Sequence, residues 1–302
     1  IVDGPGWTWK EAQSEATSIG GNLVTINDES ENQFLVDNFG FQNSKILDDF
    51  SVSDPSETYA GHWIGFSDQE EEGSWKWVNG ESITYTSLGA GQPDNNYSNS
   101  GGQDYAVILY QDQHEGYWDD LTNTDRAYRG ISETPFIRRG DSAYVIVEGP
   151  TWEEAEANAN KLGGHLVTIN DADENQWLVD NLSGQDYFYL DSFDTDFYKD
   201  SYWIGFTRNG NNFSWVDGST WEYENFGQGE PANNGNYGEI TLRTKNSDWA
   251  KQAGNWNDEA AENPHYGIAE IKIGETTTFD SSAGNSGNST GNSTGNPTVN
   301  ID

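Results

Sequence analysis

The chain of 302 residues contains no cysteine and no methionine. Without cysteine it can form no disulfide bond and has no thiolate for catalysis or metal binding. Long apolar runs are missing as well, because the most apolar stretches, such as residues 63–66, are far shorter than the ~20 residues that cross a bilayer. We therefore expect a soluble chain that folds without covalent cross-links.

Positive charge is scarce: 14 Lys and Arg stand against 51 Asp and Glu, which gives a formal net charge of −37. Such a chain repels phosphate backbones and anionic lipid, so nucleic acid and membrane insertion are excluded as partners and cations are favoured. The hydrophobic fraction is only 33%, but the aromatic fraction of 14%, with 13 Trp, supplies core material. The length allows two ordinary domains.

The chain contains an internal repeat. Residues 8–38 read TWKEAQSEATSIGGNLVTINDESENQFLVDN, and residues 151–181 read TWEEAEANANKLGGHLVTINDADENQWLVDN. Because later matches keep the same order, each repeat is a whole domain. We expect domains at residues 1–138 and 142–273, followed by a flexible Gly, Ser, Asn and Thr-rich linker at 274–302. The later matches are W-I-G-F at 63–66 and 203–206, W-V-x-G at 77–80 and 215–218, and W-x-D at 118–120 and 256–258.

Each repeat shows the same order of local signals. A Thr followed three residues later by Glu predicts a helix that begins with a capping box, and a Gly-Gly pair ends it. A short apolar run then predicts a strand, an Asp begins a second helix, and β-prone runs alternate with Gly, Asn and Asp-rich loops. This pattern indicates an α+β fold. The positions are Thr8, Glu11, Thr151 and Glu154 for the boxes, 23–26 and 166–169 for the strands, and Asp28 and Asp171 for the second helices.

Six landmarks occur in the same order in both repeats, and together they resemble the C-type lectin fold across nearly all of residues 1–273. They are a helix that ends in Gly-Gly, then L-V-T-I-N-D, W-I-G-F, W-V-x-G, x-P-x and W-x-D. The resemblance implies two C-type-lectin-like domains, each with two helices, small antiparallel sheets and a long loop region that presents ligands. Its usual disulfides are replaced, as in the cysteine-free bacterial members found in surface adhesins, so aromatic packing and bound calcium should compensate for about 2–4 kcal/mol per lost bridge. The replaced positions are Ala16, Ser132, Tyr105, Asn123, Ala159, Ala269, Tyr237 and Ala261.

The first repeat offers a candidate calcium site, because Ca²⁺ takes six to eight hard oxygen ligands that loops can bring together. Gln92-Pro93-Asp94 resembles the family's Q-P-D signature, in which the proline is cis and both flanking side chains touch calcium. By the same resemblance Asp119 and Asp120 match W-N-D, and Gln103 falls where a Glu ligand is expected. Three carboxylates brought together would repel one another, which favours a bound cation. The alternative is solvated turn acids in a very acidic protein.

The second repeat matches this ligand pattern less well. Glu230-Pro231-Ala232 carries Ala where the family's E-P-N has an oxygen ligand, although Asn233 or Asn234 could take its place. Asn257 and Asp258 keep the W-N-D motif. The resemblance therefore gives Glu230, Asn233, Asn257 and Asp258 as candidate calcium ligands, with calcium binding in this repeat left open.

In sugar-binding members of the family, two vicinal hydroxyls of a sugar complete the calcium shell. By resemblance, Q-P-D goes with galactose-type and E-P-N with mannose-type sugars, so Gln92, Asp94, Asp119 and Asp120 would bind a galactose-like glycan. Tyr97 would stack on its apolar face, or else pack on its own loop. Trp63, Trp75, Trp77, Trp203 and Trp215 match core strands of the fold, so we expect them to be core residues rather than sugar platforms.

We expect a non-enzymatic protein, since the four histidines lack metal-ligand spacing and no Ser or Cys nucleophile lies beside a base in a recognisable motif. The leading hypothesis is a calcium-dependent carbohydrate-binding module of a secreted or cell-surface adhesin. The alternatives are a calcium-stabilised protein- or ice-binding module and a spacer with vestigial sites. A chain that starts at Ile1 and ends in a linker is typical of one piece of a larger multidomain protein. Residues 136–141 are either a hinge between the repeats or a docked turn.

Overall fold

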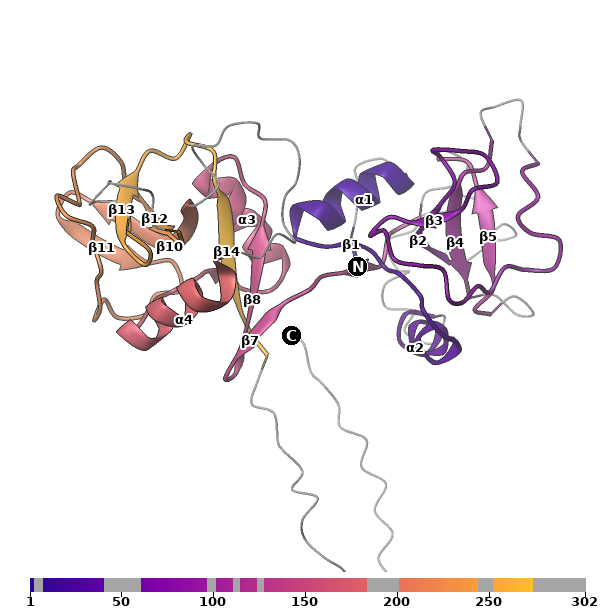
Figure 1. Ribbon diagram of the computed structural model, residues 1–302, viewed down its shortest axis with the longest axis horizontal. Coiled ribbons are helices and arrows are strands. Elements are labelled where there is room, and N and C mark those ends of the chain that lie inside the picture. The colour runs from indigo at the N-terminus through magenta and orange to yellow at the C-terminus, as the bar shows by residue number, and fades with distance from the viewer. Residues whose placement is uncertain are drawn as a thin grey trace, which may run out of the picture.

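The computed structural model describes residues 1–2, 8–40, 61–96, 102–110, 115–123, 128–183, 201–243 and 252–273. These residues form two units that lie side by side, the first in indigo to magenta and the second in pink to yellow in Figure 1. Each unit combines two helices with mainly antiparallel strands, which confirms the predicted fold class. The predicted linker at 274–302 lies outside the described residues.

The helices begin where the sequence predicts. In both first helices the Thr side chain accepts a hydrogen bond from the Glu three residues on, and the Glu side chain accepts one from the Thr N–H, so both capping boxes are confirmed. Both second helices begin after an Asp whose side chain caps them. The four helices are α1 (Trp9–Ser18), α2 (Glu29–Phe39), α3 (Trp152–Lys161) and α4 (Ala172–Leu182).

The strands of the first repeat form a four-stranded antiparallel sheet in the order β3-β2-β4-β5, and β1 pairs with β6. The strand predicted at 23–26 is shorter than expected. Beyond Leu23 the Val24 N–H donates to the Ile131 carbonyl and the Val24 carbonyl accepts from Gly65, so no single ladder continues. The strands are β1 (Asn22–Leu23), β2 (Gly61–Ser67), β3 (Lys76–Trp77), β4 (Tyr105–Leu109), β5 (Trp118–Leu121) and β6 (Ser132–Glu133).

The strands of the second repeat follow the order β13-β12-β10-β14-β8-β7, with β11 added to β10 and β9 added to β14. The β10–β14 pair is parallel and the other pairs are antiparallel. The strands are β7 (Ile137–Arg139), β8 (Ser142–Val147), β9 (His165–Leu166), β10 (Ser201–Asn209), β11 (Asn212–Trp215), β12 (Tyr237–Thr241), β13 (Trp256–Glu259) and β14 (Tyr266–Lys272).

The predicted core tryptophans lie inside the two units. Trp63, Trp77, Trp203 and Trp215 are buried, and Trp75 packs at the margin of the first core, which confirms their structural role. Within the described ranges, no helix has the length and apolar character needed to cross a bilayer.

Two of the positions where the resemblance implies a half-cystine, Tyr105 and Tyr237, make aromatic contacts. Tyr105 packs against Trp9 of α1 with ring centroids 4.9 Å apart, and Tyr237 packs against Trp152 of α3 at 4.8 Å. Such pairs contribute about 0.5–1.5 kcal/mol beyond burial, less than a typical disulfide. Each contact ties the first helix of its repeat to the central sheet and offsets part of the missing cross-link.

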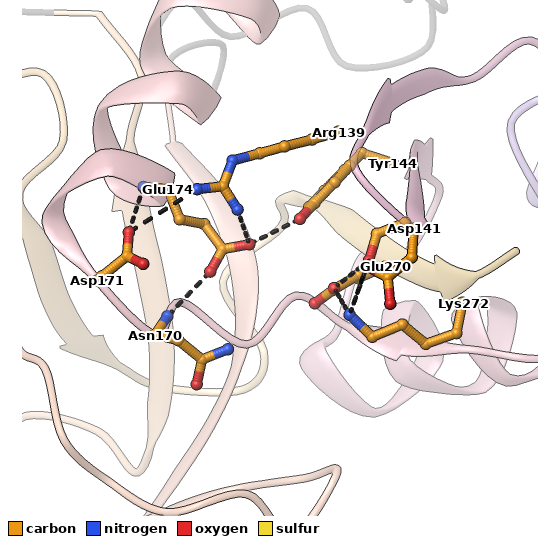
Figure 2. A network of polar contacts seen from close by, with 9 residues as sticks. Arg139, Asp141, Tyr144, Asn170, Asp171, Glu174, Glu270 and Lys272 are labelled. Atoms are coloured by element: carbon orange, nitrogen blue, oxygen red, sulfur yellow. Dashed lines mark hydrogen bonds and ion pairs between the residues drawn. The ribbon is translucent and has the colours of Figure 1, made fainter. Parts of the chain in front are cut away.

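The segment that joins the repeats is a docked turn. Strands β7 and β8 pair as a hairpin, and Figure 2 shows Arg139 reaching from β7 toward the start of α4. The Arg139 Nη1 lies 3.4 Å from Glu174 Oε1, and the Tyr144 hydroxyl donates to the same oxygen at 2.6 Å. Because Glu174 is buried, this network fixes the hairpin on the second repeat, and the hinge alternative is wrong.

The two repeats also contact each other directly. The Glu148 N–H donates to the Ser18 carbonyl at 3.0 Å, and Lys161 Nζ lies 2.7 Å from Glu15 Oε1. At Gly20, where φ is +80°, an added Cβ would lie 2.1 Å from the Ile146 carbonyl oxygen. The end of α1 therefore rests on β8 and α3. The limits at 138 and 142 given from the sequence remain predictions.

Candidate functional site

Strand β5 carries two of the predicted ligands of the first repeat, Asp119 and Asp120. The strand is held by Trp118, whose buried indole N–H donates to Asn32 Oδ1 at 2.9 Å. The Asn32 amide in turn donates to the Gly116 carbonyl at 2.9 Å. Helix α2 therefore clamps the start of β5, and the two aspartates that follow emerge at a fixed place on the sheet.

The loop that contains Gln92 and Asp94 folds over Asp120. The Gln92–Pro93 peptide bond is cis, as the resemblance implies. Asp120 is fully buried, and its two carboxylate oxygens accept from the N–H groups of Asp94 at 3.0 Å and Asn95 at 2.8 Å. The Asp120 side chain thus anchors the backbone of the loop.

Gln103 joins the same network. Its side-chain amide donates to the Asp120 carbonyl at 2.7 Å, and its Oε1 accepts from the Asn96 N–H at 2.6 Å. The Gln103 N–H donates to Asn95 Oδ1 at 2.9 Å. The structure therefore brings Asp94, Gln103 and Asp120 into one hydrogen-bond network that closes the loop on β5.

The remaining predicted residues of the first repeat differ in their surroundings. Gln92 is partly buried, and its Oε1 is shielded from solvent and makes no hydrogen bond within the described part of the chain. Asp94 is exposed and Asp119 is partly buried beside them. Tyr97, predicted to stack on a sugar, lies outside the described residues. A shielded amide oxygen without a partner is the kind of oxygen that a hard cation takes.

Three acids that the sequence interpretation missed gather beside this network. Asp68 follows β2, Glu72 lies in the next turn and Asp104 follows Gln103. A Cβ placed on Gly102 would lie 2.7 Å from Asp104 Oδ1, 3.3 Å from Glu72 Oε2 and 3.3 Å from Asn95 Oδ1. Oxygens from three separate segments therefore surround one point. The available signal was the acid two residues after W-I-G-F.

The acids beside Gly102 disfavour one another's charge. Burial raises the pKa of Asp68 above its usual range, and the negative charges of Glu72 and Asp104 raise it further. Burial, followed by the charge of Glu72, also raises the pKa of Asp104. Asp68 Oδ2 accepts from the Gly73 N–H at 2.8 Å, whereas its buried Oδ1 has no hydrogen-bond partner in the described chain. A cation placed here would relieve both the repulsion and the unsatisfied oxygen.

Carboxylates alone do not complete a metal site in this arrangement. Among the residues that the structure describes, no three His, Cys, Asp or Glu side chains converge closely enough to hold a metal ion by themselves. Amide oxygens, such as those of Gln92 and Asn95, would have to contribute. Calcium, unlike zinc, accepts such a mixed set of amide and carboxylate oxygens, so the donor set fits calcium.

The second repeat builds the same loop differently. The Glu230–Pro231 bond is cis, and the Ala232 N–H donates to Glu230 Oε2 at 2.8 Å and to Asp258 Oδ1 at 2.7 Å. Asn257 is buried on β13 and donates to Glu239 Oε1 at 3.0 Å. Burial raises the pKa of Glu230, and the negative charges of Asp258 and Glu239 add to this effect.

Arg208 occupies the space between the predicted ligands of the second repeat. Its Nη1 donates to Asp258 Oδ2 at 2.6 Å, its Nη2 donates to Asn233 Oδ1, and its Nε donates to the Gly210 carbonyl at 2.6 Å. The structure thus brings Asn233 and Asp258 together on one guanidinium. Sequence reasoning missed this residue, although it aligns with Asp68.

The chain is similar to known lectins in sequence. It is 29% identical over 123 residues to a perlucin-like protein of Mytilus galloprovincialis, a match that covers 40% of this chain and 67% of that protein. It is 33% identical over 122 residues to an alpha-N-acetylgalactosamine-specific lectin of Patiria pectinifera, covering 39% of this chain and 63% of the relative. The chain therefore spans about two thirds of the length of these relatives.

Among solved structures, the mouse scavenger receptor C-type lectin carbohydrate-recognition domain matches with a TM-score of 0.36 and 25% identity, over 45% of this chain and 93% of that domain. The family described as the lectin C-type domain matches twice, at residues 6–128 and 148–270, and so covers more than half of the chain. Together with the repeated order of helices, strands and loops, these two matches show that the chain belongs to the C-type lectin domain family, as a tandem pair without cysteine.

Proposed function

We propose that the first repeat is a calcium-dependent carbohydrate-binding module. The observation that carries the proposal is the loop of Gln92 and Asp94, which is anchored on the buried Asp120 carboxylate and contains a shielded Gln92 amide oxygen without a partner in the described chain. We assign Gln92, Asp94, Gln103, Asp119 and Asp120 as the residues that hold the ion. Calcium in this place would neutralise the acids and accept two neighbouring sugar hydroxyls as ligands.

The side chains of this site have different roles. Asp120 holds the loop by its two backbone N–H contacts, so it positions the side chains that precede it. Gln103 ties the other end of the loop to the Asp120 carbonyl. Asp94 is exposed and presents its carboxylate at the loop surface, where it can accept hydrogen bonds from sugar hydroxyls, whereas the shielded Gln92 Oε1 is proposed as a ligand of the ion.

The acids beside Gly102 are proposed to strengthen this module. Asp68, Glu72 and Asp104 belong to three segments, and a second calcium ion held by these acids together with the Asn95 amide oxygen would link β2 to the start of β4. Their mutual repulsion in the metal-free chain supports this assignment. We expect affinities of roughly 10⁻⁴ to 10⁻³ M, which are typical of calcium sites in extracellular modules.

We propose a galactose-type sugar as the ligand. The residues Gln92-Pro93-Asp94 form the Q-P-D pattern that goes with galactose-type hydroxyls, and one similar protein is named for its specificity toward alpha-N-acetylgalactosamine. Tyr97 is proposed to stack on the apolar face of the sugar ring. The strongly acidic chain suits a neutral glycan, because a neutral sugar meets no charge repulsion.

The wider setting follows from the same proposal. A module that requires calcium near the millimolar range works in an extracellular medium, so we propose that the protein is secreted or exposed at a cell surface as part of a larger adhesin. The proposed role is binding rather than catalysis. The competing role is a calcium-stabilised module that binds protein or ice.

The test combines calcium titration with sugar binding on the full chain. Isothermal titration calorimetry would measure calcium binding, and a panel of galactose, N-acetylgalactosamine and mannose surfaces would be probed at 5 mM calcium and in EDTA. We expect galactose-type binding only with calcium, and its loss in Asp120→Ala. The control is Asp37→Ala, which removes an exposed acid of α2. Calcium binding without any sugar binding would favour the protein- or ice-binding role, and sugar binding in EDTA would refute the metal.

A further inference from the structure

Arg208 in the second repeat and Asp68 in the first occupy the same structural position. Each lies two residues after the last residue of the W-I-G-F motif. The preceding residues, Ser67 and Thr207, pair with Tyr105 and Tyr237 after matching register shifts. The N–H group of Asp68 donates to the Asp104 carbonyl at 3.2 Å, and that of Arg208 donates to the Asn236 carbonyl at 2.8 Å. The exchange of acid for arginine therefore occurs at one matched site.

The guanidinium of Arg208 is buried, and it donates three hydrogen bonds. The side chain of Arg208 is 6% exposed and that of Asp258 is 0% exposed. Each of its three nitrogens meets an acceptor, on Asp258, Asn233 and the Gly210 carbonyl. Its planar fork carries a positive charge and lies over the Phe213 ring, 5.5 Å from the centroid. A permanent positive charge thus faces the buried carboxylate.

The second repeat has also lost the acids that flank this position in the first. Asn236 aligns with Asp104, and Gly235 aligns with Gln103. The two oxygens of Asp258 accept from the Ala232 N–H at 2.7 Å and from the charged Arg208. Both oxygens of Asp120 in the first repeat accept instead from uncharged backbone N–H groups. A calcium ion would meet like charge from Arg208 and fewer anionic oxygens. The residues present therefore do not fit calcium.

We infer that Arg208 replaces calcium as an internal cation in the second repeat. It binds Asp258 and the Asn233 side chain, and so holds the Glu230–Pro231 loop in its folded shape without metal. The loop is built in calcium and in EDTA alike, and any ligand of this repeat is held by protein groups alone. The inference stands whether or not the first repeat binds calcium.

Hydrogen exchange measured by mass spectrometry on the full chain tests this inference, because one experiment reports both loops. Peptides that contain Ala232 report the second loop, and peptides that contain Asp94 and Asn95 report the first. In the wild type we expect 5 mM calcium to leave exchange at Ala232 unchanged. A calcium-induced slowing at Ala232 would overturn the inference. A missing calcium response at Asp94 and Asn95 would instead count against the proposed function of the first repeat.

Two variants test the role of the guanidinium itself. Arg208→Gln keeps the length and loses the charge, and it should speed exchange at Ala232 in EDTA at least ten-fold. Arg138→Gln is the matched control, since exposed Arg138 makes the same Nε contact with the carbonyl two residues on, at 2.9 Å. It should leave Ala232 unchanged. Unchanged exchange in Arg208→Gln would refute the inference.

A double variant keeps the test decisive if Arg208→Gln unfolds the repeat. Arg208→Gln leaves the buried Asp258 without its counterion, and adding Asp258→Asn removes that charge. We expect the double variant to unfold at a higher denaturant concentration than Arg208→Gln alone. A double variant that is no more stable than Arg208→Gln would show that the charge pair is not what the arginine supplies.

Discussion

Replacing Asp120 by Ala removes the anchor of the first-repeat loop. Both carboxylate oxygens of the buried side chain accept backbone N–H groups, from Asp94 at 3.0 Å and from Asn95 at 2.8 Å. Hydrogen bonds to a charged acceptor contribute about 1.5–3 kcal/mol each. Both donors are only partly buried, and removing the acid also relieves its desolvation, so we take the lower value. We expect a loss of about 2–3 kcal/mol in the unfolding free energy.

The assay is thermal unfolding of the full chain in EDTA and in 5 mM calcium. At about 3–4 °C per kcal/mol for a domain of this size, the first repeat of Asp120→Ala should melt roughly 6–12 °C lower in EDTA. It should gain little from calcium, because the proposed shell has lost a ligand. Asp37→Ala provides the charge-matched control, since Asp37 is exposed and accepts a hydrogen bond from Gln33 of the same helix.

The melting temperatures of Asp120→Ala can refute the role of Asp120 in the loop and in the cation site. If Asp120→Ala melts within 2 °C of the wild type in EDTA, the loop does not depend on the Asp120 carboxylate. If the variant keeps the full calcium shift of the wild type, Asp120 is not part of the cation site. Equal shifts in Asp120→Ala and Asp37→Ala would reduce the effect to net charge.

Three further predictions follow from the structure. Asn32→Ala removes the two buried hydrogen bonds that clamp β5, so urea unfolding should show that the unfolding free energy of the first repeat falls by about 2–4 kcal/mol. A fall below about 1 kcal/mol would contradict the clamp. Gly20→Ala and Gly163→Ala both strain a positive φ by about 1–2 kcal/mol. The new Cβ meets the Ile146 carbonyl at Gly20, whereas at Gly163 it meets open space. Gly20→Ala should therefore lower the unfolding free energy at least twice as much, and it should increase proteolysis between the repeats. Equal costs would show that the contact between repeats adds nothing. Burial raises the pKa of Glu148, so its ionised form opposes folding. Glu148→Gln should therefore raise the unfolding free energy at pH 7, and this gain should shrink as the pH falls through the raised pKa and vanish below the usual Glu range. A gain that persists at pH 3 would point to another cause.

The fold could be predicted because its signals are local and occur twice. The capping boxes at Thr8 and Thr151 act over three residues, and the structure forms both. The tryptophans of the W-I-G-F strands are buried in both repeats as predicted. The strand predicted at 23–26 was too long, since the partners of Val24 come from β2 and Ile131, far away in sequence. Ladder length depends on such distant partners, which periodicity does not reveal.

The site was predictable only where a motif carries it. Asp94 and Asp120 lie together, because the loop folds onto β5. Asp68 and Arg208 were missed because neither belongs to a ligand motif, and their importance arises when β2 and β10 place them beside residues far along the chain. Aligning the two repeats would have shown the reversal of charge at this position.

The contact between Arg208 and Asp258 also changes how the second repeat depends on its medium. A calcium ion is present at a site only in proportion to its concentration in solution, whereas the guanidinium is tethered to β10 and has a fixed effective concentration beside Asp258. Dilution, chelation or a change of compartment therefore does not remove the positive charge of the second repeat. Under the proposed function, the first loop takes its cation from the medium, whereas the second loop carries its cation within the chain.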